Sequence, residues 1–130
     1  MDIAFRKVDV VNLPATDLAA TKRFYQEILG LSLAFEDDTT AVFHLENLMI
    51  CLTGPAKFAE LITPAAVGGA EAGARCTLSM FVEDVDAACR ELAERGVVML
   101  NGPVNRAWGM RTACFADPAG HIWEMGQDLD

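Results

Sequence analysis

The sequence predicts an α+β fold built from two copies of one βαβββ module. The first observation is a repeat: an apolar strand, Ala15-Thr16-Asp17-Leu18 and a helix recur as a strand, Val82-Glu83-Asp84-Val85 and a second helix. The second observation is that short strand patterns separated by turns follow each helix. Each copy, at about 65 residues, is small for an independent domain. We therefore expect a single domain, residues 1–130, in which module 1–53 and module 76–130 close on one another and share a cavity.

The first module reads as a strand, a helix and three short strands. The apolar residues Val8, Val10, Val11 and Leu13 predict the opening strand. Thr16 or Asp17 can cap a helix over 18–29, which Gly30 ends. Residues 31–36, 40–45 and 48–52 then predict three strands, with turns at 37–38 and 46–47.

The second module repeats this order. Residues 77–82 predict a strand, and Asp84 can cap a helix whose apolar face holds Val85, Ala88, Cys89 and Leu92 before Gly96. Strands are expected at 97–100, 112–115 and 121–125, the last two joined by the turn 117–120. Residues 54–75 are rich in Ala, Gly and Pro and predict a linker with a short helix at 56–61.

Composition and missing motifs exclude several classes of function. A formal net charge of −9 disfavours nucleic acid as a partner, because phosphates require a basic face. No apolar run is long enough to span a membrane and the first residues lack signal-peptide order, so we expect a cytoplasmic protein. The four cysteines are widely spaced without a C-x-x-C pair, which argues against disulfides and a zinc knuckle. Hydrolase, nucleotide-binding and dinucleotide-binding signatures are also missing.

An ordered set of short motifs resembles the vicinal oxygen chelate superfamily, which includes glyoxalase I, extradiol dioxygenases and the fosfomycin and bleomycin resistance proteins. The motifs cover nearly the whole chain: Asp17-Leu18, Arg23-Phe24-Tyr25, Ile28-Leu29-Gly30, Val82-Glu83-Asp84-Val85, Gly109-Met110-Arg111 and Asp117-Pro118-Ala119-Gly120-His121-Ile122-Trp123-Glu124. The resemblance implies two βαβββ modules that form a curved mixed sheet around a shared ligand cavity, often in a homodimer. Modules pair within one chain or between two chains in this superfamily.

The resemblance also implies where a divalent metal would bind in an enzyme of this group. Carried over by position, the four ligand positions hold Val10, Cys51, Thr77 and Glu124. Only Glu124 matches the enzymes, because valine has no donor atom and a threonine hydroxyl does not replace an imidazole. We therefore predict a vestigial site and no metal or other cofactor.

Four further residues have competing interpretations. By strand parity His44 is expected to face away from Cys51 and from the cavity, and His121 to lie opposite Glu124 in parity, so both histidines are interpreted as structural. Cys51 is interpreted as a small buried apolar residue rather than a nucleophile. Glu124 either holds the ammonium group of a ligand or acts as a base, or it is a relic that bonds Thr77.

Apolar side chains suited to lining a cavity are abundant. Aromatic rings give rigid contact area and methionine adapts to irregular shapes, so the expected pocket accepts varied aromatic compounds. Trp108 lies in a predicted loop, where a ring can close over a ligand or cover an edge of the sheet. Arg111 can be a cavity cation or an outward partner of an acid. The predicted ligand-binding residues are Trp108, Phe43, Met49, Met80, Met110, Phe115, Glu124 and Arg111.

Three functions are compatible with these residues. The favoured hypothesis is a metal-independent protein that sequesters an aromatic or cationic compound, such as an antibiotic, as the bleomycin resistance proteins do; it predicts no catalytic residue. The alternative is a metal-dependent lyase, isomerase or dioxygenase of the same superfamily. A third hypothesis is a partner domain with a vestigial cavity.

Overall fold

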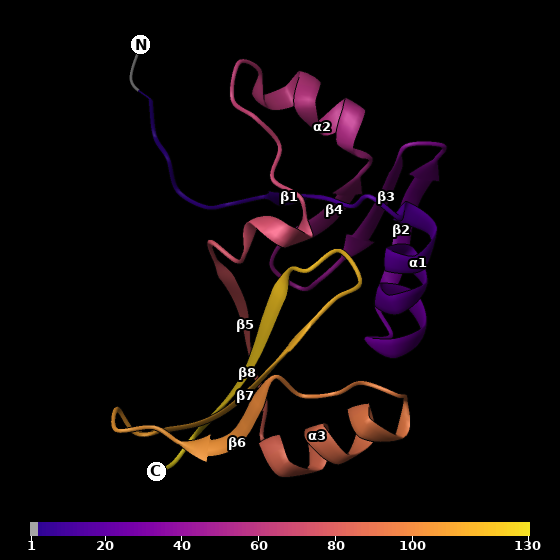
Figure 1. Cartoon of the computed structure of the whole chain (residues 1–130). Coiled ribbons are helices and arrows are strands. Elements are labelled where there is room, and N and C mark those ends of the chain that lie inside the picture. The colour runs from indigo at the N-terminus through magenta and orange to yellow at the C-terminus, as the bar shows by residue number, and fades with distance from the viewer. Residues whose placement is uncertain (1–2) are drawn as a thin grey trace. The chain divides into compact units, whose positions relative to one another are not determined.

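The computed structural model describes residues 3–130, which divide into two compact units. The first unit ends at Val67 and the second begins at Gly68 (Figure 1). Each unit holds one βαβββ module and its own four-stranded mixed sheet. The predicted α+β class and the duplication are thereby confirmed.

The first unit begins with strand β1 (Val10–Pro14), helix α1 (Leu18–Arg23) and its π-helical continuation η1 (Phe24–Ile28). Three strands follow: β2 (Ser32–Asp37), β3 (Thr40–His44) and β4 (Met49–Thr53). The sheet order is β1-β4-β3-β2, with β1 parallel to β4 and the other pairs antiparallel. Helix α2 (Pro55–Ile62) then follows, over residues for which a short helix is predicted.

The second unit has the same topology after a 3-10 turn, η2 (Ala70–Ala72). Strand β5 (Thr77–Phe81) leads to helix α3 (Val85–Glu94), and strands β6 (Asn101–Asn105), β7 (Met110–Ala116) and β8 (Ile122–Asp128) complete the module. The sheet order is β5-β8-β7-β6, with only β5 and β8 parallel.

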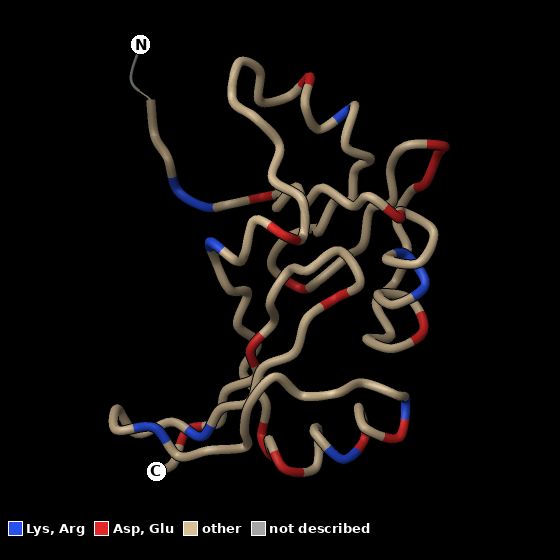
Figure 2. The backbone as a smooth tube through the Cα atoms, in the orientation of Figure 1, with Lys and Arg blue, Asp and Glu red and all other residues tan. Residues whose placement is uncertain are grey.

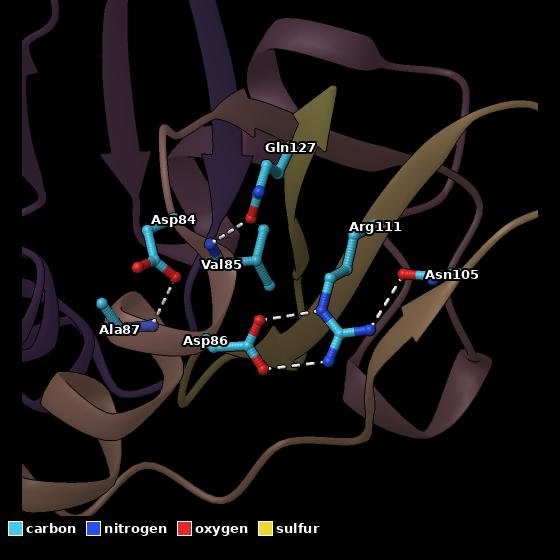
Figure 3. Close-up of polar contacts among 7 residues, drawn as sticks. All are labelled: Asp84, Val85, Asp86, Ala87, Asn105, Arg111 and Gln127. Atoms are coloured by element: carbon cyan, nitrogen blue, oxygen red, sulfur yellow. Dashed lines mark hydrogen bonds and ion pairs between the residues drawn. The ribbon is translucent and has the colours of Figure 1, made fainter. Parts of the chain in front are cut away.

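The two module helices begin and end by the same local chemistry. The Asp17 carboxylate accepts a hydrogen bond from the Ala20 N–H at 3.0 Å, and Asp84 accepts one from the Ala87 N–H at 3.0 Å (Figure 3). Each bond satisfies one of the amides that the first turn leaves unpaired. After the helices the backbone turns at Gly30 (φ 68°) and at Gly96 (φ 88°), a conformation that glycine adopts without steric cost.

One face of each sheet is covered and forms the core of its unit. In the first unit, Phe43 is fully buried and its ring centroid lies 5.6 Å from that of Tyr25 in η1. In the second unit, Phe115 and Trp123 are ladder partners on the face where α3 buries Val85, Cys89 and Leu92. We call these the covered faces.

The opposite face of each sheet carries mostly half-buried or exposed side chains, and we call it the open face. Residues two apart along a strand share a face, and so do ladder partners on neighbouring strands. The open face of the second sheet therefore carries Thr77, Ser79, Phe81, Asn101, Val104, Met110, Thr112, Cys114, Ala116, Ile122, Glu124, Gly126 and Asp128.

One predicted strand is wrong. The sequence indicates a strand at 97–100, whereas the strand that pairs with β7 is β6, Asn101–Asn105. Gly102 and Pro103 are typical of a turn, but β6 is the edge strand of its sheet, where proline is tolerated. The pairing is irregular between Asn101 and Val104, and Leu100 only donates its N–H to the Cys114 carbonyl at 2.8 Å.

Acidic residues are spread along both units rather than collected in one patch (Figure 2). Among residues 3–130, no helix is long and apolar enough to cross a membrane.

Candidate functional site

The open face of the second sheet carries a row of polar residues that crosses all four strands. Asn101 in β6 is the ladder partner of Cys114 in β7, Cys114 is the partner of Glu124 in β8, and Glu124 is the partner of Ser79 in β5. Four polar side chains, one from each strand of the sheet, therefore lie side by side.

Glu124 is the acidic centre of this row. Its side chain is half-buried, and its Oε1 accepts a hydrogen bond from the Ser79 hydroxyl at 2.9 Å. The predicted relic bond to Thr77 is therefore wrong, because Thr77 is the ladder neighbour of Ile122 instead. No Lys or Arg pairs with Glu124 within the described part of the chain, residues 3–130. The neutral Ser79 hydroxyl therefore orients the Glu124 carboxylate without acting as its counter-ion.

An apolar surface lies next to Glu124 on the same face. A Cβ added at Gly126 would meet the Met110 Cε at 3.1 Å and the Phe81 ring at 3.4 Å. Because glycine has no side chain, a methionine and an aromatic ring approach over β8 two residues from the carboxylate. The Phe81 side chain is 84% exposed in this unit, so it offers an aromatic surface beside an acid.

The turn between β6 and β7 adds a cation and a second exposed ring. The Arg106 Nε donates to the Thr112 hydroxyl at 2.9 Å, and its Nη2 donates to the Asn101 Oδ1 at 3.0 Å. The Arg106 Cζ lies 6.0 Å from the centroid of the Trp108 ring, which is 71% exposed. Trp108 lies in a loop, as predicted.

Arg106 is a residue that sequence reasoning missed. The sequence shows an arginine two positions before Trp108 but gives no sign that its guanidinium reaches back over β6 and β7. One of its acceptors, Asn101, lies in β6, the strand that the sequence pattern misplaces, and the other, Thr112, lies in β7.

Four of the eight predicted ligand-binding residues lie on covered faces. Phe43 and Phe115 are fully buried core residues, and Met80 is the ladder partner of the buried Met125. Arg111 turns toward α3. The structure therefore does not bring these residues together with Met49, Met110 and Glu124, which lie on open faces.

Arg111 forms a two-pronged ion pair with helix α3 (Figure 3). Its Nε and Nη2 donate to the two Asp86 carboxylate oxygens at 2.8 and 2.9 Å, and its Nη1 donates to Asn105 at 2.9 Å. The hydrogen bonds from Arg111 lower the pKa of Asp86, and the bonds to Asp86 raise the pKa of Arg111. This arginine holds the helix against the sheet.

The open face of the first sheet carries Met49 and Cys51 in its strand β4. Met49 and Cys51 are half-buried, and their partners in β1 are Val10 and Asn12. Cys51 occupies the ladder position that Glu124 holds in the second sheet, because Asn12 and Ser79 are equivalent partners. The Cys51 sulfur lies 3.5 Å from the Thr53 hydroxyl.

The predicted orientation of His44 is wrong. His44 pairs with Met49 across the turn that joins β3 to β4, so it lies on the same face as Met49 and Cys51 and is exposed. Strand parity alone does not predict this orientation, because the turn between β3 and β4 sets the register of the two strands. A hydrogen bond from the Leu45 N–H to the Leu48 carbonyl closes this turn. His121 lies at the exit of the β7–β8 turn, where its backbone N–H donates to the Asp117 carboxylate at 2.9 Å.

A family model supplies the decisive comparison. The model described as "Glyoxalase/Bleomycin resistance protein/Dioxygenase superfamily" matches residues 7–125. The chain belongs to this superfamily. YraH, an uncharacterized protein of Bacillus subtilis, is 30% identical over 120 residues, which cover 88% of this chain and 93% of YraH. An uncharacterized Mycobacterium tuberculosis protein, Rv0887c, is 33% identical over 68 residues, which cover 52% of this chain and only 38% of the relative.

Solved structures of superfamily proteins have the same fold. A glyoxalase/bleomycin resistance protein/dioxygenase from Nocardioides gives a TM-score of 0.88 at 22% identity, covering 99% of this chain and 87% of that one. TnmS3, an antibiotic binding protein from Streptomyces sp. CB03234, gives 0.74 at 26% identity, covering 98% and 99%. A lactoylglutathione lyase from Agrobacterium tumefaciens gives 0.75 at 22% identity, covering 92% and 91%.

The residues at the superfamily's metal positions do not fit a divalent cation. Val10 offers no donor atom, and the Thr77 hydroxyl is a weak ligand. Each unit offers one strong donor at these positions, Cys51 in the first unit and Glu124 in the second, which is too few for a stable site within a unit.

Proposed function

We propose that this superfamily member binds and sequesters a small aromatic or cationic compound, such as an antibiotic, without a metal. The observation that carries the proposal is Glu124, a half-buried carboxylate oriented by Ser79 and unpaired with any Lys or Arg among the described residues. Sequestration requires affinity and needs no catalytic group. Glu124, Trp108, Met110 and Phe81 supply that affinity.

The chemistry of the open face favours a cation attached to a flat ring. A partly desolvated carboxylate is costly to leave unpaired and attracts an ammonium group strongly. The Phe81 ring and Met110 approach over Gly126, two residues from Glu124 along β8. The ring offers a rigid apolar contact and the methionine an adaptable one. A ligand that contacts both the carboxylate and the apolar surface gains more binding free energy than a simple cation or a simple hydrocarbon would.

The comparisons support the binding hypothesis at the level of the superfamily. One structural relative, TnmS3, is described as an antibiotic binding protein. The donor set at the superfamily's metal positions supports a mechanism without metal.

One observation favours the alternative function, a metal-dependent lyase, isomerase or dioxygenase. Glu124 is retained at a position that the superfamily's enzymes use for a metal ligand, and one structural relative is described as a lactoylglutathione lyase. This alternative requires donors to replace Val10 and Thr77. Retention of a metal by the purified protein would distinguish the two functions.

We further propose a cytoplasmic homodimer. Large apolar side chains are exposed within the units, among them Phe35 on the open face of the first sheet and Phe81 on that of the second. Exposed apolar patches of this kind mark association or binding surfaces.

The experiment uses two probes that differ in charge, 9-aminoacridine, a cation at neutral pH, and neutral acridine. We expect both to quench Trp108 fluorescence, and we expect the cation to bind more tightly. Glu124→Gln should weaken 9-aminoacridine on the order of tenfold, about 1.4 kcal/mol, and leave acridine unchanged. Cys51→Ser, at the equivalent position of the first sheet, is the matched control and should change neither affinity. Failure of both probes to bind would contradict the proposal.

A further inference from the structure

The guanidinium of Arg106 is the charged group that the proposed site leaves unexplained. It lies over the open face of the second sheet, bonded to Asn101 in β6 and to Thr112 in β7. Both acceptors are neutral oxygens. Among residues 3–130, no Asp or Glu pairs with Arg106, although the chain has a net charge of −9.

Arg111 shows by contrast what a structural arginine looks like in this unit. Arg111 lies on the covered face, and both carboxylate oxygens of Asp86 neutralise its charge (Figure 3). Arg106 has no such counter-ion in the described chain, and it lies on the face that carries Glu124. The two arginines therefore divide into one that fastens a helix and one whose charge is available.

The hydrogen bonds of Arg106 fix its orientation and leave its outer edge unused. A guanidinium has five N–H donors in one plane. Nε and one N–H of Nη2 serve Thr112 and Asn101, so both N–H groups of Nη1 and one of Nη2 remain. Two parallel N–H groups on one edge match the two oxygens of a carboxylate, sulfonate or phosphate.

Asn101 is itself held in the orientation that this arrangement requires. Its Nδ2 donates to the Cys114 sulfur at 3.2 Å, which directs its Oδ1 to the Arg106 Nη2. An oriented acceptor reduces the entropy lost when a ligand binds the arginine. Asn101 is thus a positioning residue for Arg106.

We infer that Arg106 forms an anion subsite beside Trp108, so that the preferred ligand is an aromatic compound carrying a carboxylate, sulfonate or phosphate group. This inference rests on the proposed function, because it assigns the acidic end of a ligand bound to the same open face. Trp108 stacks on the aromatic part, and Arg106 binds the oxyanion. Glu124, two strands from Asn101 in the row, receives a basic group at the other end.

The test compares two fluorescent probes that differ by one acidic group, 8-anilinonaphthalene-1-sulfonate and the neutral N-phenyl-1-naphthylamine. We expect the wild-type chain to bind both and to bind the sulfonate more tightly. Arg106→Gln should weaken the sulfonate on the order of tenfold and leave the neutral probe unchanged. Asn101→Ala should weaken the sulfonate to a smaller extent. Arg95→Gln, directly after helix α3, removes the same charge at an exposed ion pair with Glu91 and should change the affinity for neither probe.

The outcomes separate the subsite from the proposed function. Loss of the sulfonate preference in Arg106→Gln, with the neutral probe retained, supports the subsite, since a merely structural role would weaken both probes. If Arg106→Gln unfolds, Arg106→Lys keeps the charge and should lose most of the preference, because an ammonium cannot form the planar fork. Equal sulfonate binding by wild type and the Arg106 variants overturns the subsite alone. Failure of the wild type to bind either probe overturns both the subsite and the proposed function.

Discussion

The two modules of this chain share a frame and differ in what they display on it. Asp17 and Asp84 cap their helices through equivalent bonds, and Phe43 and Phe115 fill equivalent core positions. On the open faces the equivalent pair is Cys51 and Glu124. The covered faces have kept similar chemistry, whereas the open faces have diverged.

This difference shows where to look for function in a duplicated fold. Residues on a covered face must satisfy packing, which restricts them to apolar side chains of similar size. Residues on an open face have no such restriction and can acquire charge. In the second module the open face presents Glu124, with Arg106 lying over it, whereas the position equivalent to Glu124 in the first module holds Cys51.

The largest expected effect comes from removing the equivalent core ring of either module. Phe43→Ala and Phe115→Ala should each destabilise the protein by about 3–5 kcal/mol, because both rings are fully buried. Urea denaturation followed by circular dichroism would measure this. Met49→Ala and Met110→Ala, on the open faces, are matched controls with smaller expected losses. A Phe115→Ala variant as stable as Met110→Ala would show that the covered face has been assigned wrongly.

Local sequence signals predicted the frame well. Asp17, Gly30, Asp84 and Gly96 act through neighbouring backbone groups, so short patterns were enough to place both helices. Strand β6 was misplaced because Gly102 and Pro103 suggest a turn. The position of β6 depends on its hydrogen-bonded pairing with β7, which short local patterns in the sequence do not show.

The candidate site was predicted less completely, since it depends on which face each residue takes. A shift of one residue moves a side chain to the other face. Phe43 and Met49 were grouped as pocket residues, yet the register of β3 and β4 puts them on opposite faces. Arg106 was missed because its partners come from two strands.

A smaller effect is expected from the ion pair that the second module makes between α3 and its sheet. Arg111 lowers the pKa of Asp86, so this carboxylate stabilises the folded state above its ordinary value of 3.8, and the contribution is lost as the pH falls toward the lowered folded value. Asp86→Asn should therefore be less stable than wild type at neutral pH. The difference should disappear in acid, and thermal unfolding across a pH series would measure it. A difference that persists unchanged in strong acid would contradict this assignment.

The metal content of the purified protein tests the central claim, metal-independent binding on an open face, most directly. Protein prepared without chelator would be incubated with Zn, Mn, Ni and Fe(II), desalted, and measured by inductively coupled plasma mass spectrometry. Acridine and 9-aminoacridine affinities would be recorded on the same samples before and after chelator treatment. We predict far less than one metal ion per chain and unchanged affinities. Near-stoichiometric metal that chelator removes together with probe binding would contradict the account and make Glu124 a candidate metal ligand.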